Sequence, residues 1–181
     1  IERGLAGMEE ISGIPGSVGG AVAMNAGAYG GEIKDVCVNV KAFDFTGKEY
    51  NFTNSQMNFS YRHSKIFEDD LIVSSASFKL KAGNKEEIEE RYEDFTNRRA
   101  TKQPLDRKSA GSTFKRPTGS YASKLIDECG LRGYRRGECQ VSEKHCGFII
   151  NVDNATCEDM LSLIEEVSKI VNEKTGFVVE R

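Results

Sequence analysis

A glycine-dense stretch near the start of the chain could hold a phosphate-bearing ligand through its backbone. It reads Gly13-Ile14-Pro15-Gly16-Ser17-Val18-Gly19-Gly20-Ala21, followed by Met24-Asn25-Ala26-Gly27-Ala28-Tyr29-Gly30. Glycine tolerates positive φ and lets the backbone come close to a ligand, so consecutive amide groups can surround an anion, and Ser17 adds a hydroxyl. No lysine follows Gly19-Gly20, so the stretch is neither a Walker A loop nor a GxGxxG fingerprint. Tight turns between short strands are the alternative interpretation.

The overall charge of the chain cannot attract such a ligand. The 181 residues carry a formal net charge of -3, which provides no bulk field for nucleic acid or anionic lipid, so neither is expected as a partner. An anionic ligand must therefore be held by a local basic cluster. Five cysteines without CxxC spacing and two histidines do not suggest a metal site, and we expect the thiols to be reduced and to pack as small apolar residues.

The hydrophobic pattern predicts that an α+β fold positions these residues. Strands are expected over 36–44, 50–52, 71–80 and 145–152, with a further strand starting at Phe177. On the strand 71–80, alternation places Ile72, Ser74, Ala76 and Phe78 on one side. Helices are expected over 84–99, 122–129 and 157–174. The inner face of the last helix is predicted to comprise Met160, Leu161, Ile164, Val167, Ile170 and Val171.

The capping residues and the change of pattern near residue 100 divide the chain. Asn84 and Thr156 are suitable N-caps, Gly176 is a suitable C-terminal residue, and Pro104 ends any continuation of the helix before it. We expect two domains, residues 1–99 and 100–181. No apolar run approaches the roughly 20 residues of a membrane helix, so no membrane association is predicted.

Five motifs follow one another along the chain. The first is the glycine-dense stretch. The others are Tyr61-Arg62-His63-Ser64, then Arg98-Arg99 with Lys102-Gln103-Pro104, then Ser109-Ala110-Gly111-Ser112-Thr113-Phe114-Lys115-Arg116-Pro117, and finally Gln140-Val141-Ser142-Glu143-Lys144-His145 with Gly147-Phe148-Ile149-Ile150-Asn151. These motifs, in this order, resemble those of the UDP-N-acetylenolpyruvoylglucosamine reductases. Any one of them could arise by chance, but five in the order of the family are a specific signal. The pattern is similar to the shorter form of the family.

The resemblance implies a fold and a reaction. The fold would be the remainder of a vanillyl-alcohol-oxidase-like FAD-binding lobe followed by a small substrate-binding domain. The reaction would reduce the enolpyruvyl ether of a UDP-sugar to UDP-N-acetylmuramate, for peptidoglycan precursor synthesis in the cytoplasm, with FAD and NADPH as cofactors. NADPH reduces the flavin, a hydride passes from flavin N5 to the methylene carbon, and the adjacent carbon is protonated.

The resemblance also implies roles for individual residues. Ser112 would be the proton donor, and Arg62 would pair the substrate carboxylate, for which a surface salt bridge with Glu68 or Asp69 is the alternative. The FAD-binding residues would be Gly13, Pro15, Gly16, Ser17, Val18, Gly19, Gly20, Asn25, Ala26, Gly27 and Arg99. The substrate-binding residues would be Tyr61, Lys102, Lys115, Arg116, Lys144 and His145. A helix C-terminal charge is the alternative for Arg99, and a structural histidine is the alternative for His145. Lys124, Arg132, Arg135 and Arg136 are expected to be solvated and are not assigned to the site.

Two departures from the family pattern affect these expectations. The amino-terminal FAD lobe of the family has no counterpart before Ile1, and the catalytic glutamate of the family would follow Arg181. The chain alone is therefore expected to bind FAD weakly or not at all. Another flavin oxidoreductase of the same fold and an inactive nucleotide-binding fragment stay open as alternatives, and the sequence leaves monomer or dimer undetermined.

Overall fold

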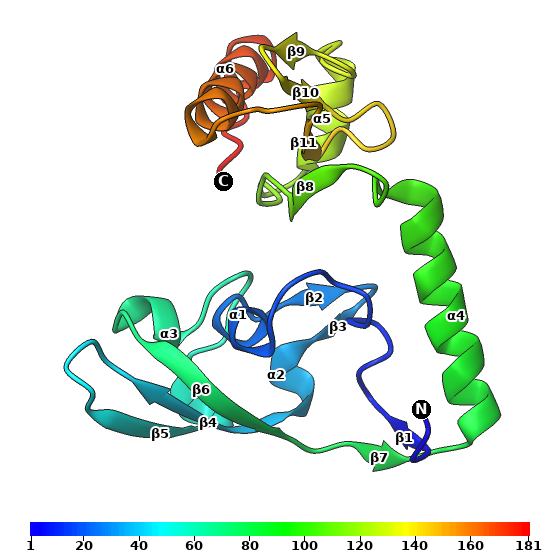
Figure 1. The fold of residues 1–181 in the computed structure, drawn as a ribbon, viewed down its shortest axis with the longest axis vertical. Helices are drawn as coiled ribbons and strands as arrows, with labels where there is room; N and C mark the ends of the chain where they lie inside the picture. The colour runs from blue at the N-terminus through cyan, green and yellow to red at the C-terminus, as the bar shows by residue number, and fades with distance from the viewer. The chain divides into compact units, whose positions relative to one another are not determined.

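The computed structural model describes all 181 residues, which form two compact units, Ile1–Arg98 and Arg99–Arg181. Figure 1 shows that each unit combines helices with a small antiparallel sheet. Each unit also has an apolar cluster of its own. The α+β composition predicted from the sequence is confirmed, and each unit is described separately below.

The first unit is built on a three-stranded sheet of order β5-β4-β6. The strands are β4 (Cys37–Phe43), β5 (Glu49–Thr53) and β6 (Ile72–Phe78). Short pairs join β1 (Leu5–Ala6) to β7 (Lys81–Ala82) and β2 (Gly27–Ala28) to β3 (Gly31–Glu32). The helices are α1 (Val18–Ala23), α2 (Ile33–Val36), a 3₁₀ turn η1 (Asn54–Met57) and α3 (Lys65–Glu68). The buried core comprises Val22, Ile33, Cys37, Val40, Ala42, Met57, Ile66 and Leu71.

A β-bulge in β6 changes which side chains face this core. Lys41 of β4 pairs with Ser75, but the next residue, Ala42, pairs with Val73, so Ser74 is an extra residue. Because a bulge resets the alternation, Val73 packs inward together with Ala76 and Phe78, while Ile72 is 53% exposed. The sequence prediction that Ile72 and Ser74 share a face with Ala76 and Phe78 is therefore wrong.

Helix α4 (Lys85–Lys102) extends three residues beyond the predicted end at Arg99. Asn84 caps it as expected, since its Oδ1 accepts the amide of Glu86 at 2.8 Å. Ile88 is buried, and Phe95 stacks on Tyr29 with ring centroids 4.8 Å apart. These two contacts fix one face of the helix to the first unit.

The second unit contains a four-stranded antiparallel sheet of order β8-β11-β10-β9. Its strands are β8 (Lys108–Ser112), β9 (Arg135–Arg136), β10 (Cys139–Val141) and β11 (Phe148–Asn151). Helices α5 (Ala122–Glu128) and α6 (Cys157–Thr175) pack with it around a core that includes Leu125, Ile126, Val141, Ile149 and Leu163. The predicted strand 145–152 is thus shorter, because residues 142–147 form a turn before β11.

Helix α6 begins and ends where its capping residues predict. Thr156 accepts the amide of Asp159, and Gly176 adopts φ 75° at the other end. Its buried side chains are Leu163, Val167 and Val171, spaced four residues apart, so they lie on one face. Leu161 is 36% exposed, and the prediction that it belongs to the inner face is wrong. Leu163 occupies that face instead.

The expected strand at Phe177–Val179 does not form. Val179 is buried, and its carbonyl accepts the hydroxyl of Ser168 at 3.1 Å. The amide of Lys115 donates to the carbonyl of Glu180 at 2.6 Å. A strand needs a ladder of such bonds, and this isolated one leaves the segment irregular.

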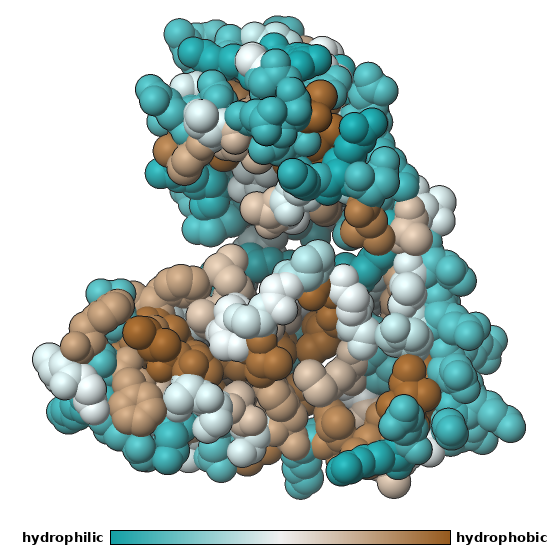
Figure 2. All heavy atoms as spheres, in the orientation of Figure 1, coloured by the Kyte–Doolittle hydropathy of each residue, from teal (hydrophilic) through white to brown (hydrophobic).

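Surface character differs between the two units. Figure 2 shows apolar side chains grouped on one face of the first unit. Its exposed large apolar residues include Val18, Phe45, Phe67 and Ile72.

The five cysteines are free. Cys37, Cys129, Cys139 and Cys146 are buried, as expected, whereas Cys157 is exposed. No helix combines the length and the apolar character needed to cross a membrane.

Candidate functional site

The glycine-dense stretch forms an exposed loop that leads into α1. Gly16 has φ 141°, and a Cβ added there would meet no atom within 4 Å, so open space lies beside this backbone. Ser17 accepts the amide of Gly20 at 3.0 Å and thereby caps α1. The amides of Gly16, Ser17, Val18 and Gly19 have no acceptor within their unit. Four unpaired N–H groups beside open space are a backbone that can receive an anion.

Asn25 organises the second glycine cluster from the inside. It is fully buried with φ 41°, and its Nδ2 donates to Glu32 at 2.9 Å and to the carbonyl of Ser60 at 3.0 Å. Its Oδ1 accepts the amide of Lys34 at 2.9 Å. The carboxylate of Glu32 also pairs with Lys34, whose hydrogen bond is the main cause that lowers the pKa of Glu32. These contacts occupy the Asn25 side chain, so its part in holding a ligand is to shape the loop.

The Tyr61-Arg62-His63-Ser64 motif is fastened to the same cluster. Arg62 has φ 53°, and its Nη2 donates to the carbonyl of Gly27 at 2.6 Å. Ser64 is buried, and its hydroxyl donates to the carbonyl of Ala23 at 2.7 Å. The structure thus brings Arg62 beside Gly27. The alternative pairing of Arg62 with Glu68 or Asp69 does not occur, because those carboxylates bind His63 and Lys65.

The remaining donors of Arg62 keep their capacity for an anion. A guanidinium has five N–H donors, and one is used on Gly27. The group also lies over the ring of Tyr61, 5.0 Å from its centroid, and Tyr61 is exposed. An aromatic face that holds the guanidinium plane leaves its edge available for a planar carboxylate.

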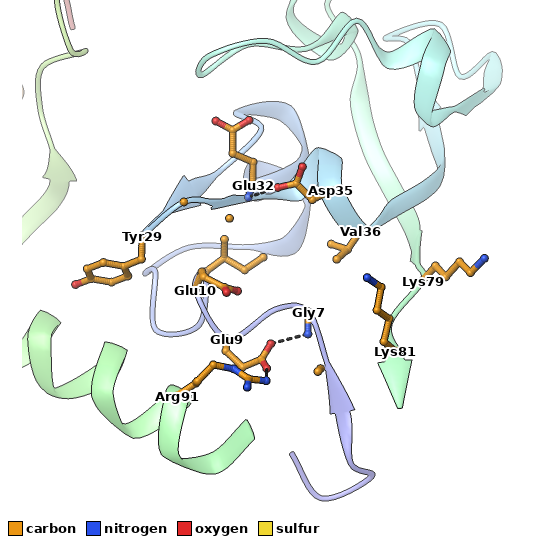
Figure 3. A pocket seen from close by; sticks show the side chains of 14 residues that line it. Gly7, Glu9, Glu10, Tyr29, Glu32, Asp35, Val36, Lys79, Lys81 and Arg91 are labelled. Carbon is orange, nitrogen blue, oxygen red and sulfur yellow. Dashed lines mark hydrogen bonds and ion pairs between the residues drawn. The ribbon is translucent and has the colours of Figure 1, made fainter. Parts of the chain in front are cut away.

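The first unit contains a cavity of about 570 Å³ away from the predicted cofactor residues. Figure 3 shows its wall, in which Arg91 pairs with Glu9 at 2.6 Å and Glu9 accepts the amide of Gly7. Tyr29 and Gly30 line it, but none of the residues assigned above to FAD or substrate does. Glu9 is buried and forms a structural ion pair with Arg91. Burial raises the pKa of Glu9, but the hydrogen bonds from Arg91 and Gly7 outweigh it, so the pKa is lowered.

In the second unit, Ser112 ends β8 next to Gly147. Ser112 pairs with Phe148 of β11, and its side chain is exposed to solvent. A Cβ at Gly147 would lie 3.4 Å from the Ser112 Oγ and 3.0 Å from Cε1 of His145. Ser112 and His145 therefore flank the same small space, which exists because residue 147 is glycine. The structure brings these two predicted residues together.

The environment of His145 selects its protonation state. Nδ1 lies 3.1 Å from the amide of Gly147, from which it accepts a hydrogen bond. The ring meets Phe148 edge-on, with centroids 5.0 Å apart. Burial lowers the pKa of His145, so the neutral form with its proton on Nε2 is favoured near pH 7. The imidazole can therefore donate a hydrogen bond from Nε2 without carrying charge.

The predicted cations of the second unit are only partly free to bind a phosphate. Lys144 Nζ donates to the carbonyl of Ala100 at 2.6 Å. Arg116 lies over the ring of Tyr121, 3.8 Å from its centroid. Lys102 and Lys115 are exposed, and Arg99 is buried at 5% exposure. Arg99 lies in the last turn of α4, where the alternative of a helix C-terminal charge places it, and its role at the flavin stays a prediction.

Sequence reasoning missed Ser64 and Arg132. Ser64 lies in a motif but received no role, although its bond to Ala23 ties two motifs together. Arg132 was assigned to solvent, whereas it forms a two-bond pair with Asp127 and donates to the carbonyl of Glu143. The available signal was Gly133, which directly follows Arg132. Glycine favours a turn at positive φ, and a turn at this point can direct the side chain of Arg132.

Family models match most of the chain. Residues 103–181 match the C-terminal domain of UDP-N-acetylenolpyruvoylglucosamine reductase, and residues 2–53 match an FAD binding domain. The first match contains Ser112, Gly147 and His145. The second contains the glycine-dense stretch and Asn25.

Curated relatives and a solved structure carry the same name. UDP-N-acetylenolpyruvoylglucosamine reductase of Caldanaerobacter subterraneus subsp. tengcongensis is 54% identical over 172 residues, which are 95% of this chain and 57% of that protein. The Clostridioides difficile protein is 51% identical over 97% of this chain and 58% of its own length. The crystal structure of the Thermus caldophilus reductase matches with a TM-score of 0.86 and 39% identity, over 98% of this chain and 64% of that one.

The chain thus spans less than two thirds of the length of these relatives. Within that span, the family models match part of each unit, and they include the glycine-dense stretch and the segments with Ser112 and His145. The sequence matches and the shared fold show that the chain belongs to the UDP-N-acetylenolpyruvoylglucosamine reductase family.

Proposed function

We propose that a protein carrying this chain reduces UDP-N-acetylenolpyruvoylglucosamine to UDP-N-acetylmuramate with NADPH and FAD, in peptidoglycan precursor synthesis. The observation that carries the proposal is the pair Ser112 and His145 around Gly147, within a segment matched to the C-terminal domain of the reductase. The relatives named above support the same activity. Since both NADPH and nucleotide sugars are cytoplasmic compounds, we place the reaction in the cytoplasm.

Unit Ile1–Arg98 is proposed to contribute part of the FAD site. The unpaired amides of Gly16 to Gly19 and the open space at Gly16 fit the diphosphate of a dinucleotide, and residues 2–53 match an FAD binding domain. When bound, FAD would supply the hydride that it receives from NADPH. We also assign Gly13, Pro15, Gly20, Ala26, Gly27 and Arg99 to this site, with Asn25 shaping the loop.

Unit Arg99–Arg181 is proposed to supply the proton and the binding groups for the UDP-sugar. The Ser112 hydroxyl would donate a proton to the substrate carbon next to the carboxylate, and the neutral Nε2–H of His145 would hydrogen-bond the substrate. Lys102, Lys115, Arg116 and Lys144 are the proposed diphosphate contacts, with Tyr61 of the first unit lining the sugar site. Arg62 would stabilise the charge that develops on the carboxylate, because its fork matches two carboxylate oxygens.

Ser112→Ala in the flavin-loaded enzyme separates the two half-reactions. We expect flavin reduction by NADPH to stay within about twofold, and reoxidation by the enolpyruvyl substrate to slow by about 100-fold or more, since general acid catalysis contributes about that factor. Stopped-flow absorbance of the flavin measures both rates. Thr113→Ala is not a suitable control, because its hydroxyl accepts the amide of Ile149, so Ser109→Ala, on the same strand, serves instead.

Two outcomes would count against these proposals. Equal slowing of both half-reactions in Ser112→Ala would remove the proton-donor role. For the 181-residue chain on its own, we propose weak FAD binding at most and no NADPH oxidation. A yellow preparation with flavin near unit occupancy would contradict that proposal.

A further inference from the structure

The turn from Ser142 to Cys146 contains Lys144 and His145. The ion pair between Arg132 and Asp127 binds the backbone of this turn. Arg132 donates from Nε and Nη2 to the two oxygens of Asp127, at 2.9 and 2.6 Å. Its third nitrogen, Nη1, donates to the carbonyl of Glu143. The planar guanidinium therefore joins α5, which contains Asp127, to the backbone of the turn.

The same pair also reaches the other end of the turn. The buried thiol of Cys146 lies close enough to Asp127 and Arg132 for both groups to act on its pKa. Glu143 is thus bonded to the Asp127–Arg132 pair and Cys146 lies near it, and the two residues between them are Lys144 and His145. Because the pair fastens the first flank of the turn and adjoins the second, the positions of those two side chains depend on it.

The neighbouring turn leaves room for this arrangement. A Cβ on Gly133, which has φ 72°, would lie 3.3 Å from Cγ of Glu143. Gly133 donates its amide to the carbonyl of Val141, and its own carbonyl accepts from Gln140. The segment after α5 is therefore bonded to the strand that enters the turn, and Arg132 extends this contact by two more residues.

From the turn, the contact continues to the proposed proton donor. Ser142 is buried, its Oγ accepts the amides of Lys144 and His145, and its amide donates to Phe148. His145 packs over Gly147, beside the Ser112 hydroxyl. A shift of the turn would therefore move His145 relative to Ser112.

We propose that Arg132, paired with Asp127, is a positioning residue that holds His145 beside Ser112 for the reductive step. The proposal rests on the proposed function for its effect on turnover, but its effect on His145 can be measured without any ligand. Arg132 and Asp127 are nearly half exposed, so solvent screening limits what the pair adds to folding stability. Its geometry, which ties the backbone of the turn to α5, is what a site needs from a residue that supports it.

The chain offers a matched control. Arg136 pairs with Glu166 at 2.9 Å in the same unit. The exposed fractions of the two side chains are 52% and 31%, and those of Arg132 and Asp127 are 44% and 45%. The side chain of Arg136 makes no hydrogen bond to the turn, and its partner Glu166 also accepts the hydroxyl of Tyr134. Arg136→Ala therefore removes a similar ion pair and leaves the turn intact.

The first measurement uses the 181-residue chain and nitrogen-15 NMR of the histidine rings. We expect Arg132→Ala to change the Nδ1 and Nε2 shifts of His145 and to raise its pKa, since burial and the charge of Arg132 both keep that pKa low. Arg136→Ala should leave the His145 signals unchanged, and Arg132→Lys should give an intermediate result. Identical His145 spectra in wild type and Arg132→Ala would overturn the positioning role, whether or not the chain is a reductase.

The second measurement uses the complete flavin-loaded enzyme. We expect Arg132→Ala to slow reoxidation by the enolpyruvyl substrate by about 10- to 100-fold, because a small misplacement of a reacting group costs that much, with flavin reduction by NADPH within about twofold. Added guanidinium ion should restore part of the rate. If both half-reactions slow equally, or if Arg136→Ala has the same effect, the proposal fails. If the wild type does not turn over this substrate, the proposed function fails while the NMR result still decides the role of Arg132.

Discussion

Asn25 shows how one buried side chain can shape a glycine-rich loop from the inside. Its amide and carbonyl groups make three hydrogen bonds, to Glu32, Ser60 and Lys34. These bonds come from separate segments, so the side chain joins the second glycine cluster to the motif that contains Arg62. Sequence reasoning placed Asn25 in the cofactor site, and the bonds explain why an asparagine suits the position.

Asn25→Ala is expected to destabilise the first unit by about 2–3 kcal/mol, since buried groups lose their partners and alanine is strained at positive φ. Urea unfolding of the 181-residue chain measures the loss. Asn51→Ala is the control, because Asn51 is exposed and makes one side-chain bond, to Glu49 at 3.1 Å, so its change should stay within about 0.5 kcal/mol. Similar losses in the two variants would contradict the buried-hub role of Asn25.

How far the site could be predicted differs from residue to residue. Ser112 and His145 were selected by their motifs, and the structure brings them to one space because Gly147 lacks a side chain. Arg132 was not selected, because its proposed role depends on Asp127, five residues before it, and Glu143, eleven residues after it, and neither residue type marks a partner in the sequence. Lys144 was selected as a phosphate contact, yet its ammonium is also bonded to Ala100, a long-range contact that no local pattern reveals.

At the scale of elements, capping residues and periodicity predicted the three longest helices, whereas the short helices α1, α2 and α3 were not predicted. Asn84, Thr156 and Gly176 act as expected, because a cap depends on residues within one turn. The faces were harder to predict. The bulge at Ser74 exchanges the inward-facing and outward-facing side chains at the start of β6. The register of β6 is set by its pairing with β4, so the alternation within the strand alone does not reveal the shift.

Helix α6 allows a direct test of its corrected face. Leu163 is fully buried and Leu161 is 36% exposed on the same helix. We expect Leu163→Ala to lower the free energy of unfolding by about 2–5 kcal/mol through the lost contacts and the cavity. Leu161→Ala should cost less than about 1 kcal/mol, as it removes a half-exposed side chain. Urea titration of each variant gives both numbers, and a larger loss for Leu161→Ala would restore the sequence-based face.

At the scale of the whole molecule, the chain has two separate apolar clusters. One contains Met57 and the other Leu163, and they share no residue. A protein with two such cores can unfold in more than one cooperative step. The boundary expected after residue 99 came from a change of pattern, and the compact units divide between Arg98 and Arg99. Which functions belong to the two units stays a proposal.

Calorimetry of the 181-residue chain tests the independence of the two cores. We expect two transitions, and each core variant should shift only one of them. Met57→Ala and Leu163→Ala each remove a fully buried side chain, at an expected cost of about 2–5 kcal/mol to its own unit. A single transition that both variants lower together would show that the chain unfolds as one cooperative body.

The distribution of thiols has a practical consequence for such experiments. Four of the five cysteines are buried, and burial raises the pKa of Cys37, Cys139 and Cys146, which keeps them as unreactive thiols. Cys157 is exposed at the first turn of α6. A maleimide dye should therefore attach at this one position in the native protein, which gives a fluorescent reporter on the second unit without any engineered cysteine.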